Sequence, residues 1–548
     1  MLQLSLLFTK GCVLQRGDKT KIWGKATPSA TVQVEFLGQS YTTQANSEEN
    51  CLKNDTKGNL RENMQKGDWE VFLNDLPPGG PHTLIVQSDG QTIEIPDVLI
   101  GDVWLCGGQS NMEFPMKRVR YMYPELYETA QNDSIRQFTV PQRHNFEKPC
   151  KDLEAGQWNS LSPENIPDFT AVGLFFAQRL FDQYNIPIGL IATAVGGTPI
   201  HAWMGRDMLA EFPEVLAEAD LCSDDAYINQ VLDTETEKRE KGIAYLDQHD
   251  KGLSESWYSY EYDDSNWDTR DLCTPWETGL REPGAIWFRR TLDIPKEMAG
   301  KKGMIFIGTL QDADTVYING KIIGGTEYRY PPREYEVPPL PAGKCVIAVR
   351  VRNFYGEGGF TPYKGYHIVC GKHSIDLNGE WQYKRGVLCD KFEPQTFFFY
   401  KPTGLFNGMI APLTNFAIKG AIWYQGESDT GRSPETYGKR FTNMINGWRD
   451  IWGLGDFPFM FTELTHYTEL DTGHEPEGWG LLRIQQKAAL KLPNTAMALT
   501  MDVGEYNDLH PQNKEAIGLR LARATLAVAY DEDMPGSPFI LYGKNDNL

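Results

Sequence analysis

The segment Gly101–Met116, GDVWLCGGQSNMEFPM, contains the change of pattern on which the fold assignment depends. A strand-like apolar run ends in two glycines, and the polar residues Gln109, Ser110 and Asn111 follow where a helix should begin. A serine in that position holds its hydroxyl at the mouth of a sheet, and its N–H, at a helix N-terminus, can face a developing negative charge. The same serine can equally act as a helix N-cap. This segment alone therefore does not decide between a nucleophile and a cap.

Upstream of this segment the chain has short alternating runs separated by turns. TVQVEF at residues 31–36 and HTLIVQS at residues 82–88 are examples. Alternation of apolar and polar residues between Gly- and Pro-rich turns is typical of antiparallel strands. We therefore expect an N-terminal β-sandwich over residues 1–98.

Downstream of this segment, apolar strand-like runs alternate with helical stretches. IGLIATAVGG (residues 188–197) and GAIWYQGE (residues 420–427) resemble buried strands, and AVGLFFAQRLFDQY (residues 171–184) has the pattern of a helix. This alternation predicts an α/β layer sandwich, in which sites lie at the carboxyl ends of parallel strands. We assign residues 99–250 and 393–548 to this domain.

The region between these two parts, residues 251–392, returns to a β pattern. GAIWFRRTLDIP (residues 284–295) and AGKCVIAVRVRN (residues 342–353) are rich in β-branched and aromatic residues, with Asn-Gly and Gly-Gly turns between the runs. The pattern predicts an antiparallel β jelly roll inserted at a surface loop of the α/β domain.

Composition excludes several classes of function. The 548 residues carry a formal net charge of −21, which argues against nucleic acid or an anionic membrane as the main partner. No run approaches the roughly 20 apolar residues of a membrane span. The start of the chain has no signal-peptide pattern, and nine cysteines without CxxC spacing favour reduced thiols. We therefore expect a cytoplasmic protein; the alternative is a secreted or periplasmic one from which the signal has been removed.

Two further strand ends carry groups suited to acyl transfer. Gly196 and Gly197 follow a buried strand, where a backbone N–H can serve as a second oxyanion donor. Gln425 follows another, and its side-chain amide is a candidate third donor, with Glu427 and Asp429 fixing the loop or the substrate. Taken singly, each has an ordinary alternative, a tight turn for the glycines and a polar loop for the acids.

A candidate general base lies in DVGEYNDLHPQNK, residues 502–514. His510 can accept the proton of a serine if another group holds its second ring nitrogen as a donor. Asp508 and Asn507 are the local candidates for that role. Nucleophile, backbone donor, amide donor and base at four strand ends form a coherent set, which favours Ser110 as a nucleophile over a cap.

The blocks GQSNM, AVGGTPI, WYQGESD and DLHP resemble, in this order, those of the SGNH hydrolase superfamily, and more narrowly those of the sialate O-acetylesterase family, which is related to acetylxylan esterases. The resemblance implies a flavodoxin-like three-layer α/β/α hydrolase domain and a serine esterase acting on acetylated carbohydrate, without a metal or other cofactor. It implies Ser110 as nucleophile, His510 as base, and an oxyanion hole made by Ser110, Gly196 or Gly197, and Gln425.

One question about the residues stays open within this resemblance, the group that orients His510. Many relatives have an aspartate three residues before the histidine, where this chain has Asn507; the carboxylate is one residue later, at Asp508. Either Asp508 reaches His510 or the site is a Ser–His dyad. Gln109, Glu427, Asp429 and Asn507 are the expected substrate contacts.

The inserted segment resembles the sugar-binding jelly roll of family 2 glycoside hydrolases. Its residues Trp267, Trp287 and Tyr317 are candidates for stacking on a sugar, with a place in the sandwich core as the alternative. Three functions follow for the whole chain: an esterase for acetylated sialic acid, an esterase for acetylated plant polysaccharide such as xylan, or a carbohydrate-binding protein without catalysis.

Overall fold

The structure, a computed structural model, describes residues 2–17, 19–47, 67–329, 331–356, 358–362, 364–468, 473–505, 508–533 and 540–542. The chain forms two compact units. The first consists of Met1–Asp224, Phe397–Glu469 and His474–Leu548, and the second of Asp225–Thr396 and Leu470–Gly473. These divisions differ from the expected boundaries at 251 and 392, because the long helix that starts at Asp225 packs against a strand of the second unit.

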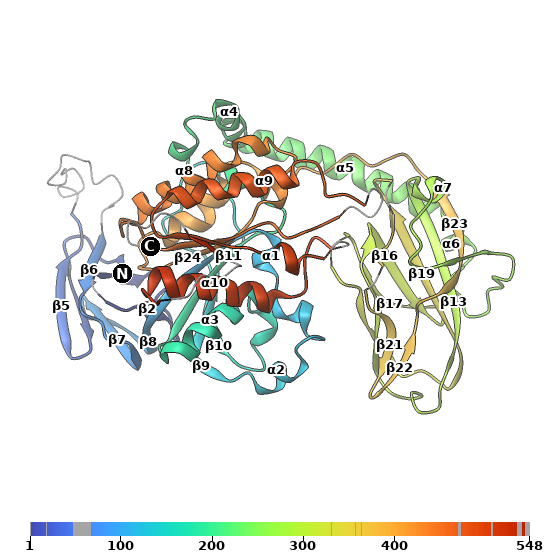
Figure 1. The fold of residues 1–548 in the computed structure, drawn as a ribbon, viewed down its shortest axis with the longest axis horizontal. Helices are drawn as coiled ribbons and strands as arrows, with labels where there is room; N and C mark the ends of the chain where they lie inside the picture. Colours follow the sequence, from blue (N-terminus) through green and yellow to red (C-terminus); the bar gives the residue numbers. More distant parts are fainter. Residues whose placement is uncertain are drawn as a thin grey trace. The chain divides into compact units, whose positions relative to one another are not determined.

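The first unit is built on a sheet with the strand order β10-β9-β11-β8-β24-β25-β26-β27 (Figure 1). The bounds are β8 (Gln91–Gly108), β9 (Asn132–Thr139), β10 (Trp158–Leu161), β11 (Ile188–Ala194), β24 (Gly420–Tyr424), β25 (Phe459–Thr462), β26 (Thr495–Ala498) and β27 (Ile540–Tyr542). Neighbours from β9 to β26 run parallel, and the two edge pairs run antiparallel. Without β9, the parallel strands follow the order second, first, third, fourth, fifth along the chain. The winding therefore reverses between β8 and β24, where ligand sites of such sheets lie.

Helices connect these strands; short 3-10 or π helices are labelled η. The bounds in the first unit are α1 (Ser110–Glu113), η2 (Met116–Val119), α2 (Pro124–Thr129), η3 (Ile166–Asp168), α3 (Ala171–Tyr184), η4 (Ile200–Trp203), η5 (Asp207–Leu209), α4 (Pro213–Cys222), η6 (Phe398–Tyr400), η7 (Phe406–Ile410), η8 (Ala411–Leu413), η9 (Glu427–Asp429), η10 (Pro434–Thr436), α8 (Tyr437–Trp452), α9 (Trp479–Gln486), η11 (Lys487–Lys491), η12 (Met501–Val503) and α10 (Lys514–Ala529). Among the described residues, none of the helices has the length and apolar character needed to span a membrane.

Both faces of the sheet are covered by helices, and strand β24 shows how its side chains divide between them. Ala421 and Trp423 belong to a core shared with α8 and α9, whereas Ile422 and Tyr424 belong to a core shared with α3 and α10. Successive side chains of a strand point to opposite faces, so a strand buried on both sides is apolar throughout. This explains why the run GAIWY shows no alternation.

The N-terminal strands form a separate sheet, β1-β3-β6, and an extension of the large sheet in which β2 and β7 pair with β8, β4 with β7, and β5 with β4. Their bounds are β1 (Gln3–Leu4), β2 (Val13–Gln15), β3 (Thr20–Lys25), β4 (Thr31–Phe36), β5 (Gln39–Gln44), β6 (Asp68–Leu73) and β7 (Gly79–Ser88). The first half of β8 pairs antiparallel with β7, and its second half pairs parallel with β11 and β24. The expected boundary between residues 98 and 99 therefore falls inside one continuous strand.

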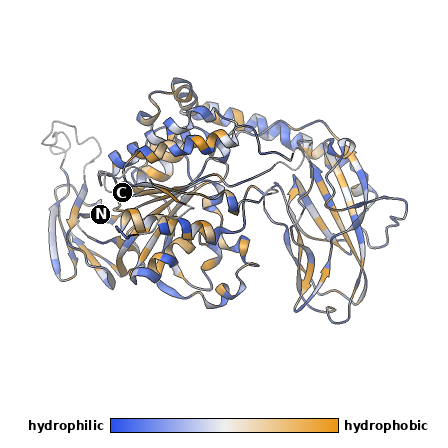
Figure 2. Ribbon diagram, in the orientation of Figure 1, coloured by the Kyte–Doolittle hydropathy of each residue, from blue (hydrophilic) through white to orange (hydrophobic). Residues whose placement is uncertain are grey.

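The second unit is antiparallel throughout its named strands. Its sheets have the orders β12-β23-β13-β19-β16-β17, β18-β14-β21-β22 and β15-β20. The bounds are α5 (Asp225–His249), α6 (Lys251–Ser254), β12 (Asp268–Asp271), α7 (Thr278–Arg281), β13 (Gly284–Ile294), β14 (Gly303–Ile307), β15 (Leu310–Gln311), β16 (Ala313–Ile318), β17 (Lys321–Thr326), β18 (Glu334–Val337), β19 (Gly343–Asn353), β20 (Gly359–Phe360), β21 (Tyr366–Cys370), β22 (His373–Asp376) and β23 (Glu380–Leu388). Helix α5 is largely hydrophilic in Figure 2, and only Ile228 and Leu246 on it are buried.

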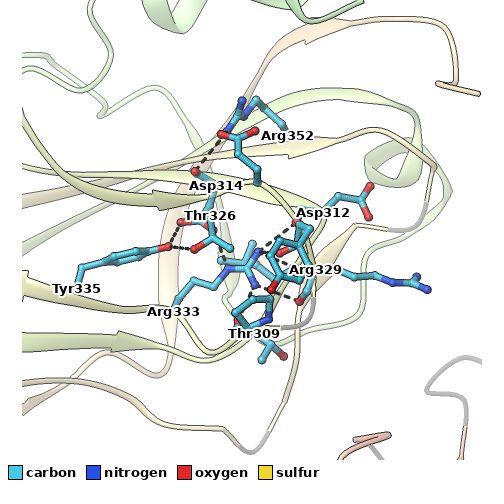
Figure 3. A network of polar contacts seen from close by, with 12 residues as sticks. Thr309, Asp312, Asp314, Thr326, Arg329, Arg333, Tyr335 and Arg352 are labelled. Carbon is cyan, nitrogen blue, oxygen red and sulfur yellow. Dashed lines mark hydrogen bonds and ion pairs between the residues drawn. The ribbon is translucent and has the colours of Figure 1, made fainter. Parts of the chain in front are cut away.

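An ion pair lies in the interior of the second unit (Figure 3). Arg333 Nε donates to Asp314 Oδ1 at 2.7 Å, and neither side chain is exposed. Tyr335 donates its hydroxyl to the other oxygen of Asp314 at 2.8 Å, and the Arg333 guanidinium donates to backbone carbonyls, including that of Asp312. Buried charges are tolerated when hydrogen bonds satisfy them in this way.

The three aromatic residues considered for sugar stacking lie in the core of this unit. Trp267, Trp287 and Tyr317 form one buried cluster, and Trp287 has no exposed surface. Its indole Nε1 donates to Asp250 Oδ1 at 3.0 Å, so its polar edge is also satisfied internally. These rings therefore support the fold and are closed to a sugar.

Candidate active site

Ser110 begins helix α1 directly after strand β8, at the reversal point of the sheet. Gly108 is in the left-handed region at φ +139°, and a Cβ there would lie 2.1 Å from the carbonyl oxygen of Tyr424. Only glycine fits that close approach of β8 to β24. The N–H of Ser110 has no acceptor among the described residues, as is usual for the first residues of a helix.

His510 meets the serine from the loop that precedes α10. Its Nε2 lies 2.9 Å from Ser110 Oγ, a hydrogen-bond distance between residues 400 positions apart. The ring is 6% exposed, and burial lowers the pKa of His510 below its ordinary value. A neutral imidazole at neutral pH can accept the serine proton, so the pair has the geometry of a nucleophile and its general base.

Asp508 is the carboxylate that faces this histidine. Its Oδ1 lies 3.6 Å from His510 Nδ1, an ion-pair distance rather than a hydrogen bond. The same oxygen accepts the backbone N–H of His510 at 2.8 Å, a two-residue turn that aspartate favours. Asp508 opposes the effect of burial by raising the pKa of His510. Asn507, the other candidate, lies outside the described residues.

Of the two glycines after β11, Gly196 lies beside Ser110, and Gly197 is the position that requires a glycine. A Cβ on Gly196 would lie 3.4 Å from Ser110 Cβ and 3.1 Å from Glu113 Oε2. Gly197 has φ +76°, and a Cβ there would lie 2.0 Å from the hydroxyl of Tyr400. The structure thus places Gly196, one of the two expected backbone donors, next to the serine.

Glu113 occupies one of these donors. Its Oε2 accepts the N–H of Gly196 at 2.6 Å, and its Oε1 accepts from Gln142 Nε2 at 2.8 Å. Surrounding protein raises the pKa of the Glu113 carboxyl, although these hydrogen bonds and Arg118 act in the opposite direction. For the Gly196 N–H to bind an oxyanion, this carboxylate must be displaced. Sequence reasoning missed Glu113, although a residue three positions after Ser110 on a helix shares its face.

Gln425, expected as an oxyanion donor, has no hydrogen left to donate. Its Nε2 donates to Asp429 Oδ2 at 2.6 Å and to the Thr198 carbonyl at 3.1 Å. Its Oε1 accepts the hydroxyl of Tyr437 at 2.8 Å, and the side chain is 0% exposed. An amide has two N–H hydrogens, and a buried carboxylate is the stronger acceptor for one of them. The expected donor role was wrong for this arrangement, in which Gln425 is a structural bridge.

Asp429, expected as a substrate contact, is also 0% exposed. Its carboxylate accepts the N–H of Ile200 at 2.9 Å and Arg440 Nη1 at 3.1 Å, besides the amide of Gln425. Burial raises the pKa of Asp429, and the charge of Arg440 opposes that effect. This expectation is corrected as well, because Asp429 fastens the loop after β11 to the loop after β24 and does not reach substrate.

Glu427 takes part in a buried polar chain behind the serine. Its Oε1 accepts from Asn111 Nδ2 at 2.6 Å, and Asn111 Oδ1 accepts from Lys514 Nζ. Glu427 Oε2 is buried and has no hydrogen-bond partner within the described ranges. Burial lowers the pKa of Lys514 to about 7 and raises the pKa of Glu427. Glu427 was expected to touch substrate; in the structure its carboxylate is used inside the protein.

Asn111 also donates to the carbonyl of Leu509 at 3.1 Å, the residue before His510. Asn111, the residue after Ser110, therefore anchors the loop that carries His510. Gln109, the residue before Ser110, anchors the loop after β24 in the same way. Its Oε1 accepts the N–H groups of Gly426 and Ser428, each at 3.3 Å. Among the described residues, no group of three or more His, Cys, Asp and Glu side chains is placed to hold a metal ion.

The chain is similar to known proteins in sequence and in fold. The model of a family described as carbohydrate esterase, sialic acid-specific acetylesterase, matches residues 100–238 and 389–527, about half of the chain. The sialate O-acetylesterases of Rattus norvegicus and Homo sapiens are each 24% identical to it over 93% of this chain, and over 70% and 68% of their own lengths. A carbohydrate acetylesterase from Xanthomonas citri has a similar fold, with a TM-score of 0.56 at 24% identity, covering 97% of this chain and 76% of that one.

Proposed function

Because this chain belongs to the sialic acid-specific acetylesterase family of carbohydrate esterases, we propose that it removes O-acetyl groups from sialic acid through an acyl-enzyme on Ser110. The observation that carries the proposal is the 2.9 Å contact between Ser110 Oγ and His510 Nε2. It pairs a serine at a helix N-terminus with a neutral base, and the carboxylate of Asp508 faces the other ring nitrogen.

The reaction follows from these positions. His510 Nε2 takes the proton of Ser110 as Oγ attacks the acetyl carbonyl, and Asp508 stabilises the imidazolium. The N–H of Ser110 and that of Gly196, once Glu113 has moved away, face the oxyanion. His510 then protonates the departing sugar oxygen, which leaves as a hydroxyl group. Water, deprotonated by His510, attacks the acetyl-serine; acetate is released and His510 returns the proton to Ser110 Oγ.

The finer fold assignment belongs to the same proposal. The strand order around β8 and the helices on both faces support an SGNH-type, flavodoxin-like three-layer hydrolase domain. The antiparallel sheets of the second unit support an inserted β jelly roll. The sheet β1-β3-β6, together with the strands β4, β5 and β7 that extend from the first half of β8, supports an N-terminal β-sandwich. Of the predicted substrate contacts, Gln109 remains a proposal.

Acetate release from defined substrates tests the function. We expect release from O-acetylated sialic acid and little from acetylated xylan oligomers, with Ser110→Ala abolishing both. Preference for xylan would identify a polysaccharide esterase. Binding of sugar without acetate release from any acetylated glycan would identify the non-catalytic alternative.

A further inference from the structure

Three chain segments near Ser110, at the carboxyl ends of the parallel strands, are joined by hydrogen bonds. The loop after β11 is joined to the loop after β24 by the contacts Ile200 N to Asp429 Oδ2 and Gln425 Nε2 to the Thr198 carbonyl. His201 Nε2, at 3.0 Å from the Tyr400 carbonyl, joins η6 to the loop after β11. Burial lowers the pKa of His201 to about 3, so this contact keeps a neutral imidazole.

Tyr400 is brought next to the nucleophile by this arrangement. Its hydroxyl lies against Gly197, where a Cβ would be 2.0 Å away, and Gly196 lies against Ser110. The ring of Phe397 packs on Tyr400 at a centroid distance of 5.1 Å and is 53% exposed. An aromatic surface therefore lies against Gly197, the residue that follows the neighbour of Ser110.

Arg432 adds a positive charge to this surface. Its Cζ lies 5.7 Å from the centre of the Tyr400 ring, within the range of a cation–π contact. Its backbone carbonyl accepts a hydrogen bond from Nη2 of the buried Arg440 at 3.1 Å, and this contact anchors the loop that carries Arg432 to helix α8. The Arg432 side chain is exposed, and its guanidinium forms no ion pair at contact distance in the described part of the chain, although its charge lowers the pKa of the buried Asp429. In a protein with a net charge of −21, an exposed arginine without such an ion pair offers a local site for an anionic group.

We propose that Arg432 and Tyr400 form a subsite that binds the carboxylate of an acidic sugar while its acetyl ester lies at Ser110. The guanidinium has the planar donor geometry that matches a carboxylate, and stacking on Tyr400 orients it before substrate binds. The subsite rests on the proposed function and adds to it the feature of the substrate that is recognised. It distinguishes sialic acid, which carries a carboxylate, from a neutral sugar such as acetylated xylose.

The test compares three acetyl esters with the full chain: O-acetylated sialic acid, the same compound with its carboxylate methylated, and 4-nitrophenyl acetate. Release of acetate, not of methanol, is measured. Arg432→Met is expected to lower kcat/KM for the free acid roughly tenfold or more, as expected for losing a charge-assisted pair. The other two esters should change by less than about twofold, since neither presents a carboxylate.

Two variants complete the experiment. Arg432→Lys should retain part of the preference for the free acid, because ammonium keeps the charge and loses the planar fork. Arg523→Met removes one charge from the exposed outer part of α10 and should leave all three rates unchanged. Equal loss on all three esters with Arg432→Met, or no loss on the free acid, overturns the subsite. A wild-type protein inactive on the free acid overturns the proposed function instead.

Discussion

Lys514 Nζ donates to the Oδ1 of Asn111, and this contact joins the first turn of α10 to the helix of the nucleophile. The other end of the Asn111 amide donates to Glu427 and to the carbonyl of Leu509. A buried cation, amide and carboxylate therefore fix the distance between the serine helix and the histidine loop. Lys514 Nζ also lies 4.7 Å from the centre of the Phe114 ring, which contributes to its burial.

Lys514→Met is expected to destabilise the fold and shift the pH profile. Asn111 Oδ1 then loses its buried donor and Glu427 loses a nearby positive charge, which should cost about 1–3 kcal/mol. The charge of Lys514 lowers the pKa of His510, so its loss should move the acid limb of kcat/KM to higher pH. Urea unfolding and a pH–rate profile measure the two effects.

The matched control is the double variant Lys514→Met with Glu427→Gln. Neutralising both partners should recover part of the stability, so the two changes are not additive. If the free energies of unfolding simply add, the two residues are not coupled as described.

Asp508→Asn tests whether the carboxylate assists His510. Asparagine preserves the acceptor for the His510 N–H and loses the charge that stabilises the imidazolium. We expect kcat/KM to fall roughly 10- to 100-fold, the equivalent of a charged hydrogen bond. The acid limb, already below the 6.5 or so of free histidine in the wild type, should move lower still, since Asp508 raises the pKa of His510. An unchanged rate and profile would point to a Ser–His dyad.

Gln425→Leu separates a structural bridge from an oxyanion donor. Loss of the amide removes one buried hydrogen bond from Asp429 and one from Tyr437, so the free energy of unfolding should fall by about 1–3 kcal/mol. Below the unfolding temperature, kcat should drop less than tenfold, whereas loss of an oxyanion donor typically costs about 10²–10³. A hundredfold drop in kcat with unchanged stability would restore Gln425 to the oxyanion hole.

Glu113→Gln tests the carboxylate that occupies the Gly196 N–H. A neutral amide oxygen still accepts this N–H but is easier to displace, since charged hydrogen bonds are about 1 kcal/mol stronger. Removing the anion from beside the developing oxyanion should therefore raise kcat/KM about fivefold at neutral pH. A tenfold decrease in initial-rate assays would instead show that the carboxylate contacts the substrate.

The sequence predicted the proposed nucleophile and base better than the contacts that support them. Ser110 and His510 could be found because a strand-to-helix turn and a polar loop at the end of an α/β unit are local signals. The role of Asp429 could not, since its partner Arg440 lies on the next helix and its burial depends on long-range packing. For the same reason Gln425 looked available to substrate.

The domain boundaries also could not be predicted from sequence pattern, because they too depend on long-range packing. A change from alternating to continuous apolar residues marks the point where β8 enters the buried sheet, but the strand itself does not break there. The sequence of helix α5 did not indicate which of the two units the helix belongs to. Pattern predicts the type of an element, whereas the partner of an exposed helix is decided by tertiary contacts.

The most direct test of the account is covalent labelling of the nucleophile. An organophosphonate should add to the protein once, and mass mapping should place the adduct on Ser110, with acetate release falling in proportion. The His510→Ala variant should be labelled far more slowly, because no base then takes the Ser110 proton as Oγ attacks the phosphonate. Labelling at another residue, or full acetate release from protein labelled on Ser110, would contradict the central claim.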